Sequence, residues 1–367
     1  MSRPALARVH LDHIVHNFEL AAALCPANGQ ALAVVKANAY GHGAAAVAQA
    51  LAPVAPAFAV ACIEEALELR AAGIQQPILL LEGFFTPDEL PLIAEQGLWT
   101  AIHRPEQLVQ IQAARLSAPL TAWIKLDSGM HRLGLPLEQA IPVIQQAQSM
   151  AAIEKVVVMT HFANADLEAP TGISPQAQIA RLITALDGLE GQGKGVDIDL
   201  SLANSAALLA HPQARRQWQR PGIMLYGASP LECGNAESQQ LRPAMTLETG
   251  IIATRWIEAG ESVGYGSRFV AERPTRVGTA AIGYADGYPR QAREGTPVAV
   301  DGQRTRLIGR VSMDMITVDL TDLEAVEVGS RVELWGQQID ANEVAACCDT
   351  IAYHLFTGVT RRVPRRY

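Results

Sequence analysis

Lys36 occupies a position where a lysine could do covalent or acid–base chemistry. It ends the apolar run ALAVVK and is followed by the segment ANAYGHG. A lysine at the mouth of a buried strand is costly unless its amine is paired or used covalently. Desolvation lowers the pKa of such an amine, which suits a Schiff-base lysine or a general base. A lysine that only extends its ammonium from a strand end into solvent is the alternative.

Two later positions could bind an anion. Ser205 follows an apolar run and could present its hydroxyl at the start of a helix, while Gly222 would let a second backbone amide approach the same anion. In parallel α/β barrels, the loops after the seventh and eighth strands often bind phosphate. A plain helix N-cap is the alternative role for Ser205.

The remaining candidates are two arginines and a few histidines. Arg132 and Arg220 could each bind a carboxylate through two parallel hydrogen bonds, and ordinary surface arginine is the alternative for both. His161 could ligate a metal, but no second His or Cys lies at ligand spacing, and His42 and His131 are no better placed. We therefore predict no metal site.

These residues follow short apolar runs that alternate with amphipathic stretches between residues 10 and 235. The expected strands cover residues 31–36, 57–62, 77–81, 98–102, 120–126, 156–161, 198–203 and 222–226. The expected helices include residues 12–25, 64–72, 87–96, 105–116, 137–150 and 175–189. Such alternation predicts a parallel sheet with crossover helices, and eight repeats favour a closed (β/α)₈ TIM-type barrel over an open doubly wound sheet. Active sites of these barrels lie at the C-terminal ends of the strands, where the candidate residues are found.

After Pro243 the pattern changes to short alternating runs separated by turn residues. The expected strands cover residues 246–257, 275–282, 297–300, 305–311, 316–320 and 331–335. We therefore predict a barrel domain over residues 10–235 and a mostly β C-terminal domain over residues 236–367, with residues 1–9 attached to the latter.

Composition narrows the class of protein. The 367 residues are 49% hydrophobic, which is enough for two or three domains with buried cores. A formal net charge of -8 argues against nucleic acid as the main partner, and no apolar run is long enough to span a membrane. The basic C-terminal run is read as a solvated or interface tail. The five cysteines have no disulfide or metal spacing, which predicts a reducing, cytoplasmic location.

A series of segments resembles the alanine racemases, pyridoxal phosphate (PLP) enzymes built from a barrel and a β domain. The segments are VVKANAYGHG (34–43), KLDSGMHRLG (125–134), THFANAD (160–166), ANSAA (203–207), RPGIMLYG (220–227), VGYGSRF (263–269), IGYADGYPR (282–290) and GRVSMD (309–314). They follow the family's order and cover nearly the whole chain, so the resemblance is highly specific.

The resemblance implies roles for individual residues. Lys36 would carry PLP and act on one face of the substrate α-carbon, and Tyr265 of the partner subunit would act on the other face. The PLP phosphate would be held by Tyr40, Ser205, Gly222 and Ile223, and the pyridine nitrogen would face Arg220, with His161 and Asn204 in support. Arg132 would contact the PLP phenolic oxygen and the substrate carboxylate, aided by the backbone amide of Met313 of the partner subunit. Lys125 matches a lysine that is carbamylated in many relatives.

These roles are chemically consistent with racemisation. Two acid/base groups must flank the α-carbon, because a proton leaves one face and returns to the other. An arginine opposite the ring nitrogen keeps that nitrogen unprotonated, which disfavours decarboxylation and transamination. A tyrosine acting as a base near neutral pH needs cationic neighbours, and His161 and Arg220 are expected to provide them. A head-to-tail homodimer with shared sites follows.

Two alternatives remain open. One is a racemase of broader specificity, acting on serine or basic amino acids. The other is a non-catalytic PLP-binding protein, which would need neither a β domain nor Tyr265. Some relatives have a tyrosine just before the tripeptide RVP, where this chain has Thr360 and Arg361, so the substrate entrance is expected to differ. The sequence does not distinguish a role in cell-wall synthesis from one in alanine breakdown.

Overall fold

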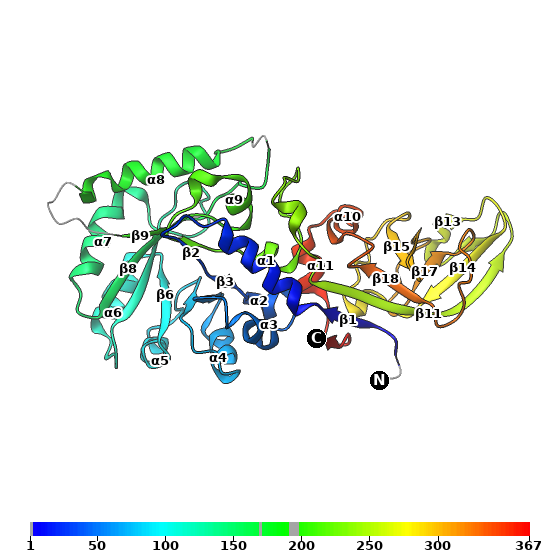
Figure 1. The fold of residues 1–367 in the computed structure, drawn as a ribbon, viewed down its shortest axis with the longest axis horizontal. Helices are drawn as coiled ribbons and strands as arrows, with labels where there is room; N and C mark the ends of the chain where they lie inside the picture. Colours follow the sequence, from blue (N-terminus) through cyan, green and yellow to red (C-terminus); the bar gives the residue numbers. More distant parts are fainter. Residues whose placement is uncertain (1–2, 169–170, 191–197) are drawn as a thin grey trace.

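The computed structural model describes residues 3–168, 171–190 and 198–367. Figure 1 shows two lobes side by side, one in which strands and helices alternate and one built mostly of strands. No helix in the described part of the chain is both long and apolar enough to cross a membrane.

The first lobe is a parallel barrel. Seven strands lie in sequence order, namely β3 (Ala33–Val34), β4 (Phe58–Val60), β5 (Ile78–Leu80), β6 (Leu98–Ile102), β7 (Leu120–Lys125), β8 (Ile153–Met159) and β9 (Asp199–Ser201). A short eighth strand, β10 (Trp218–Gln219), pairs with β2 (Gln30–Ala31). The N–H of Arg220 donates to Ala203 O at 2.9 Å, and the N–H of Leu32 donates to Gln219 O at 3.0 Å. These bonds close the ring, so the predicted barrel is confirmed and the open sheet is excluded.

Helices surround the barrel, and their apolar faces pack on it. They are α1 (Leu11–Ala23), α3 (Ala44–Leu51), α4 (Ile63–Ala71), α5 (Leu90–Glu95), α6 (Pro105–Ala113), α7 (Ala140–Ser149), α8 (Pro175–Glu190) and α9 (Ser205–Ala210). Short 3₁₀ turns are η1 (Pro87–Glu89), η2 (Leu137–Gln139), η3 (Pro212–Ala214), η4 (Ile223–Tyr226) and η5 (Ser238–Gln240). In α1 the buried side chains Ile14, Phe18 and Ala21 recur at helical spacing, which explains why this stretch forms a core-facing helix. Pro105 starts α6, where its missing N–H costs nothing.

Several expected strands differ from the structure in their bounds, and two of these differences lie next to the candidate site. The run 222–226 was expected to be the eighth strand, but residues 223–226 form η4, and β10 lies just before it. An apolar run of this length is compatible with either structure when it is buried, as Tyr226 is, with its hydroxyl donating to Val34 O at 2.9 Å. The first strand ends at Val34, so Lys36 does not end a strand but begins a tight turn, α2 (Lys36–Tyr40).

The second lobe is mostly β, as predicted. Its strands are β11 (Met245–Ile257), β12 (Ser262–Val263), β13 (Phe269–Val270), β14 (Thr275–Ala280), β15 (Pro297–Val300), β16 (Gln303–Arg306), β17 (Ile316–Asp319) and β18 (Arg331–Trp335), with 3₁₀ turns η6 (Tyr265–Ser267) and η7 (Tyr284–Asp286). Both ends of the chain join this sheet, because β1 (Leu6–Val9) pairs with β11 and with β19 (Arg365–Arg366).

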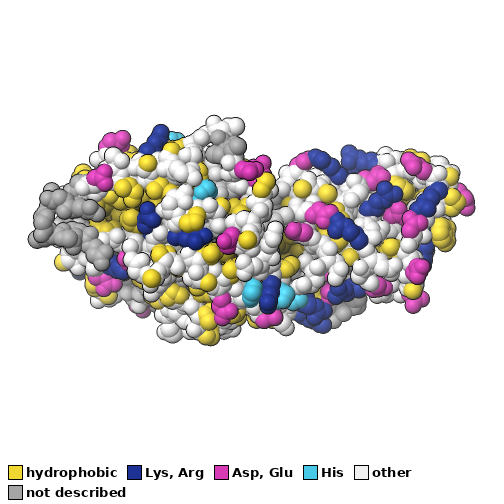
Figure 2. Space-filling model, turned by 45° about the horizontal axis from the view of Figure 1, so that its top comes forward, with side chains coloured by type: hydrophobic (Ala, Val, Ile, Leu, Met, Phe, Trp, Pro, Cys, Tyr) yellow, Lys and Arg dark blue, Asp and Glu magenta, His cyan; other side chains and the backbone are white. Residues whose placement is uncertain are grey.

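Two helices of the second lobe, α10 (Ala341–Ala346) and α11 (Ala352–Gly358), were not predicted. Helix α11 brings this lobe against the barrel, since Phe356 packs edge-on against His42 with ring centroids 5.2 Å apart. Figure 2 shows acidic and basic side chains interspersed over this lobe. Ion pairs such as Arg273–Asp322, in which both side chains are exposed, add little stability.

Candidate active site

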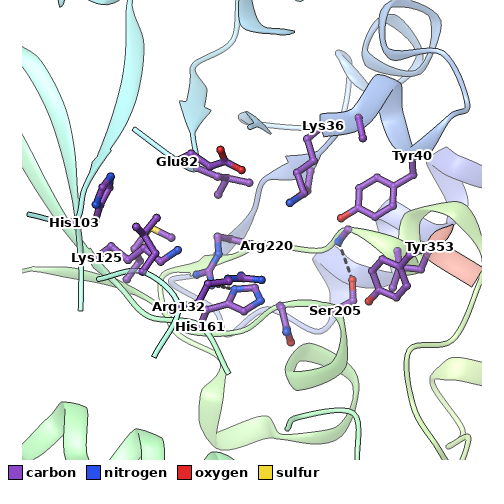
Figure 3. Close-up of a pocket in the computed structure, with 18 of the residues that line it drawn as sticks. Lys36, Tyr40, Glu82, His103, Lys125, Arg132, His161, Ser205, Arg220 and Tyr353 are labelled. Carbon is purple, nitrogen blue, oxygen red and sulfur yellow. Dashed lines mark hydrogen bonds between the residues drawn. The ribbon is translucent and has the colours of Figure 1, made fainter. Parts of the chain in front are cut away.

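The C-terminal ends of the barrel strands surround a cavity of about 860 Å³. Figure 3 shows its polar side chains converging from different strands. The cavity brings together most of the residues predicted from the sequence, namely Lys36, Tyr40, Lys125, Arg132, His161, Asn204, Ser205, Arg220, Gly222 and Ile223.

Lys36 and Tyr40 reach the cavity from the two ends of a left-handed turn. Ala37, Asn38, Ala39 and Tyr40 have φ values of 51°, 55°, 52° and 52°. This conformation costs a residue with a side chain roughly 1–2 kcal/mol, so four in succession are rare. The turn continues into Gly41 at φ 81°, where a Cβ would lie 2.1 Å from Phe356 O, so only glycine fits. The strained turn places the Lys36 amine and the Tyr40 hydroxyl on the same wall of the cavity (Figure 3).

Ser205 is not the N-cap of α9. Asn204 caps this helix, because its Oδ1 accepts from the N–H of Ala207 at 3.0 Å. Ser205 Oγ instead accepts from the N–H of Gly222 at 2.8 Å and from that of Met224 at 3.4 Å. Both lone pairs of the hydroxyl are then occupied, so its proton is left to donate into the cavity.

Gly222 faces the same corner of the cavity. A Cβ on Gly222 would lie 2.5 Å from the Tyr40 hydroxyl oxygen, so the missing side chain lets this tyrosine and the backbone approach each other. Among the described residues the Tyr40 hydroxyl has no hydrogen-bond partner. Two free O–H donors therefore point at one small volume, which suits the oxygens of an anion.

Arg220 is buried, so the alternative of an ordinary surface arginine is wrong for this residue. Its guanidinium donates to Ser201 O at 2.7 Å and to Thr160 O at 2.6 Å. It also lies 3.5 Å from His161 Nδ1. Burial lowers the pKa of Arg220 to about 10, so it stays cationic at neutral pH. These hydrogen bonds to backbone carbonyls fix the orientation of the guanidinium plane in the cavity wall.

His161 does not supply the expected positive charge. Burial, followed by the charge of Arg220, holds the pKa of His161 well below its usual range, so the imidazole is neutral at neutral pH. Any cationic neighbourhood at this site therefore comes from arginine and lysine.

The cavity as a whole attracts anions. Five lining side chains are cationic, namely Lys36, Arg104, Lys125, Arg132 and Arg220, and Glu82 is the one acidic side chain among the lining residues. Burial, followed by the charges of Arg220 and Arg132, lowers the pKa of Lys125 to about 8. Lys125 is then mostly cationic at pH 7, but roughly a tenth of it is an uncharged, nucleophilic amine, far more than for an exposed lysine.

Tyr265 and Met313 do not line this cavity. Both belong to the second lobe and are exposed, at 72% and 52% respectively. The same chain therefore does not bring them to Lys36.

Several lining residues were missed by the sequence patterns, among them Glu82, His103, Arg104 and Tyr353. Glu82, His103 and Arg104 directly follow β5 and β6, and the rule that polar residues after barrel strands face the site could have found them. Tyr353 comes from α11 of the second lobe and has its ring centroid 5.9 Å from that of Tyr40. No local signal marked Tyr353, because its place depends on how the two lobes pack.

No three His, Cys, Asp or Glu side chains in residues 3–168, 171–190 and 198–367 lie close enough together to hold a metal ion.

Comparison with known proteins decides the family. Residues 9–230 match the alanine racemase N-terminal domain, and residues 244–367 match the alanine racemase C-terminal domain. The chain belongs to the alanine racemase family. It is 52% identical over 365 residues to the catabolic alanine racemase of Pseudomonas putida, covering 100% of this chain and 99% of the relative.

Solved alanine racemases have the same fold. The biosynthetic enzyme of Pseudomonas aeruginosa superposes with a TM-score of 0.91 at 47% identity, over 100% of this chain and 99% of the other. The Bartonella henselae enzyme, solved with covalently bound pyridoxal phosphate, has a TM-score of 0.85 at 30% identity over 99% of each chain. The chain is thus an isomerase that racemises alanine. These relatives do not favour the broader-specificity racemase, and they give no support to a non-catalytic PLP-binding protein.

Proposed function

We propose that this alanine racemase works by a two-base mechanism, with Lys36 on one face of the substrate and Tyr265 of the partner subunit on the other. The observation that carries the proposal is the convergence of the Lys36 amine, two free hydroxyl donors and a cation-rich wall on one cavity. An aldehyde cofactor with an anionic tail needs an amine and an anion-binding site in one cavity.

PLP fits the donor set of this cavity. When bound, PLP withdraws electrons from the substrate α-carbon and so acidifies its C–H bond. The hydroxyls of Tyr40 and Ser205 and the backbone at Gly222 and Ile223 would hold its phosphate, and a side chain on Gly222 would fill that cradle. By capping α9, Asn204 would stabilise the start of this helix next to the phosphate site.

Arg220 would face the pyridine nitrogen. Because Arg220 remains protonated and is held by backbone carbonyls, it can offer an N–H but cannot accept a proton. Neutral His161 beside it would support the orientation of its guanidinium.

Arg132 would bind the substrate carboxylate, together with the backbone amide of Met313 of the partner subunit. Lys125 lines the same cavity. Its uncharged amine could add to carbon dioxide, forming an N–C bond and releasing one proton, to give a carbamate anion. We propose that this anion orients Arg132, which an ammonium at the same place would repel.

Proton transfer then needs one group on each face. Lys36 takes the α-proton of one enantiomer at Nζ, and Tyr265 of the partner subunit returns a proton from Oη to the opposite face. The roles exchange in the reverse direction. The exposure of Tyr265 and Met313 away from their own cavity supports a head-to-tail homodimer with shared sites.

The domain division remains a proposal. We infer a PLP-binding barrel over residues 10–235 and a β-rich domain over residues 236–367 with residues 1–9 attached. The pairing of β1 with β11 supports this attachment.

The test is the absorbance spectrum of the purified protein, followed by alanine racemisation in D₂O. We expect a band near ~420 nm that is lost in Lys36→Ala, and solvent deuterium in both enantiomers. Borohydride reduction followed by peptide mass analysis should place the cofactor on Lys36. A protein that stays colourless and inactive after PLP is added would refute the proposal.

A further inference from the structure

The left-handed turn after β3 must be held by its surroundings. Its residues 37–40 have the left-handed conformation, which residues with a side chain disfavour, and Ala37 and Asn38 are exposed to solvent. Packing therefore does little to hold this end of the turn. A strained segment of this kind persists only where specific contacts over-determine it.

Glu65, on α4, makes the contact that holds the Lys36 end. Its Oε1 accepts from the N–H of Ala37 at 2.7 Å, and its Oε2 accepts from the N–H of Ala61 at 2.7 Å. Both hydrogen bonds go to a charged acceptor, which makes them stronger than neutral ones. Ala37 is the first left-handed residue, so the Glu65 carboxylate binds the turn at the point where the chain leaves the sheet.

The carboxylate replaces the next rung of the parallel ladder. The N–H of Ala33 donates to Ala57 O, and the N–H of Val35 donates to Ala59 O, both at 2.9 Å. Continuing this pattern, the N–H of Ala37 would donate to Ala61 O. Instead both Ala37 and Ala61 donate to Glu65, so the chain can leave the sheet at Lys36 while its backbone donors stay satisfied.

The far end of the turn is tied separately. Asn38 Oδ1 accepts from the N–H of Ala44 at 2.8 Å, and Gly41 O accepts from Nε of Arg365 at 3.0 Å. These contacts hold the Tyr40 end to α3 and to the C-terminal strand. The start of the turn is held by Glu65 and by the N–H of Ala39, which donates to Val35 O at 2.8 Å.

We propose that Glu65 is a positioning residue, whose carboxylate holds the left-handed turn so that the Lys36 amine and the Tyr40 hydroxyl face the same ligand. The inference rests on the proposed function, because it takes PLP as that ligand. Glu65 itself does not line the cavity, so it acts through the turn.

The test compares Glu65→Gln with Glu68→Gln. Glu68 is exposed on the same helix, and its side chain makes no hydrogen bond among the described residues, so it is the matched control. Glutamine has one acceptor oxygen, so one of the two backbone N–H groups loses its partner. We expect the Kd of apo Glu65→Gln for PLP to rise about ten- to a hundredfold, the range for losing a hydrogen bond to a charged group. Glu68→Gln should match the wild type.

Two further measurements separate positioning from general stability. Pyridoxal has no phosphate, and its borohydride trapping on Lys36 should be slower in Glu65→Gln than in the wild type. The two proteins are compared under conditions in which both are fully folded. Amide hydrogen exchange of the apo protein should speed up in residues 36–41 and not in α4. Adding Ala37→Gly should partly restore PLP affinity, because glycine adopts the left-handed conformation without the side-chain cost. This double variant also serves if Glu65→Gln alone fails to fold.

The outcomes distinguish a failure of the inference about Glu65 from a failure of the proposed function. If the wild type binds PLP and Glu65→Gln binds it with the same Kd and trapping rate, the inference is overturned and the proposed function stands, even if thermal stability falls. If the wild type binds no PLP at Lys36, the proposed function fails and the inference fails with it.

Discussion

Replacing Gly222 with alanine should weaken PLP binding without unfolding the barrel. The added Cβ would lie 2.5 Å from the Tyr40 hydroxyl oxygen and 3.2 Å from its Cζ. The hydroxyl must therefore shift by about 1 Å to reach an ordinary contact distance of roughly 3.5 Å. That shift takes it away from a phosphate placed against Ser205. A lost hydrogen bond to a charged group costs about 1.5–3 kcal/mol, which is about a ten- to hundredfold rise in Kd.

The assay is equilibrium titration of the apo protein with PLP, with urea unfolding measured in parallel. Gly250→Ala is the matched control, because its Cβ would meet its nearest neighbour, Pro4, at 3.4 Å. Pyridoxal has no phosphate, so the wild type and Gly222→Ala should bind it about equally. A Gly222→Ala protein that binds PLP as tightly as the wild type would show that the corner formed by Tyr40, Ser205 and Gly222 is not the phosphate site.

Three further predictions concern charge and assembly. The pKa of Lys125 is lowered from 10.5 to about 8, so between these values the folded state holds fewer protons than the unfolded state and stability rises with pH. In carbon dioxide-free buffer, Lys125→Met should show a smaller rise in urea midpoint across this window, and an equal rise would contradict the burial argument. Mixed dimers of Lys36→Ala and Tyr265→Phe contain one intact site, so they should regain up to about half the wild-type activity; inactive mixtures would rule out shared sites. Asp286 is buried and accepts from Arg3 at 2.7 Å, so Asp286→Asn should lower the free energy of unfolding by about 1–3 kcal/mol, and an unchanged urea midpoint would contradict this.

Some features followed directly from local patterns. The strands at 98–102, 297–300 and 331–335 were predicted with the bounds they have, because each is a short apolar or alternating run flanked by turn residues. Lys36 was singled out because it ends such a run, Ser205 because it follows one and Arg220 because it leads into one. Barrel topology brings the ends of parallel strands to one face. Family motifs then added further cavity residues such as Tyr40 and Ile223.

Other features depend on contacts between distant segments. The left-handed turn at residues 37–40 contradicts local preference and is held by Glu65, whose sequence position gives no hint of this contact. The helical form of residues 223–226 was missed because apolar pattern alone does not separate a buried strand from a buried 3₁₀ turn. The neutral state of His161 follows from burial beside cations that other strands supply.

The sequence by itself determined the barrel, the β-rich second part, the family and ten of the cavity residues, since these depend on periodicity and on motifs that are local in the chain. Only the tertiary structure decided which of these residues share a cavity, that Asn204 rather than Ser205 caps α9, and that Tyr353 reaches the site from the second lobe. It also placed Tyr265 and Met313 outside their own chain's cavity. The physical reason is that burial, hydrogen-bond partners and electrostatic neighbours are set by segments far apart in the chain, and no local pattern records them.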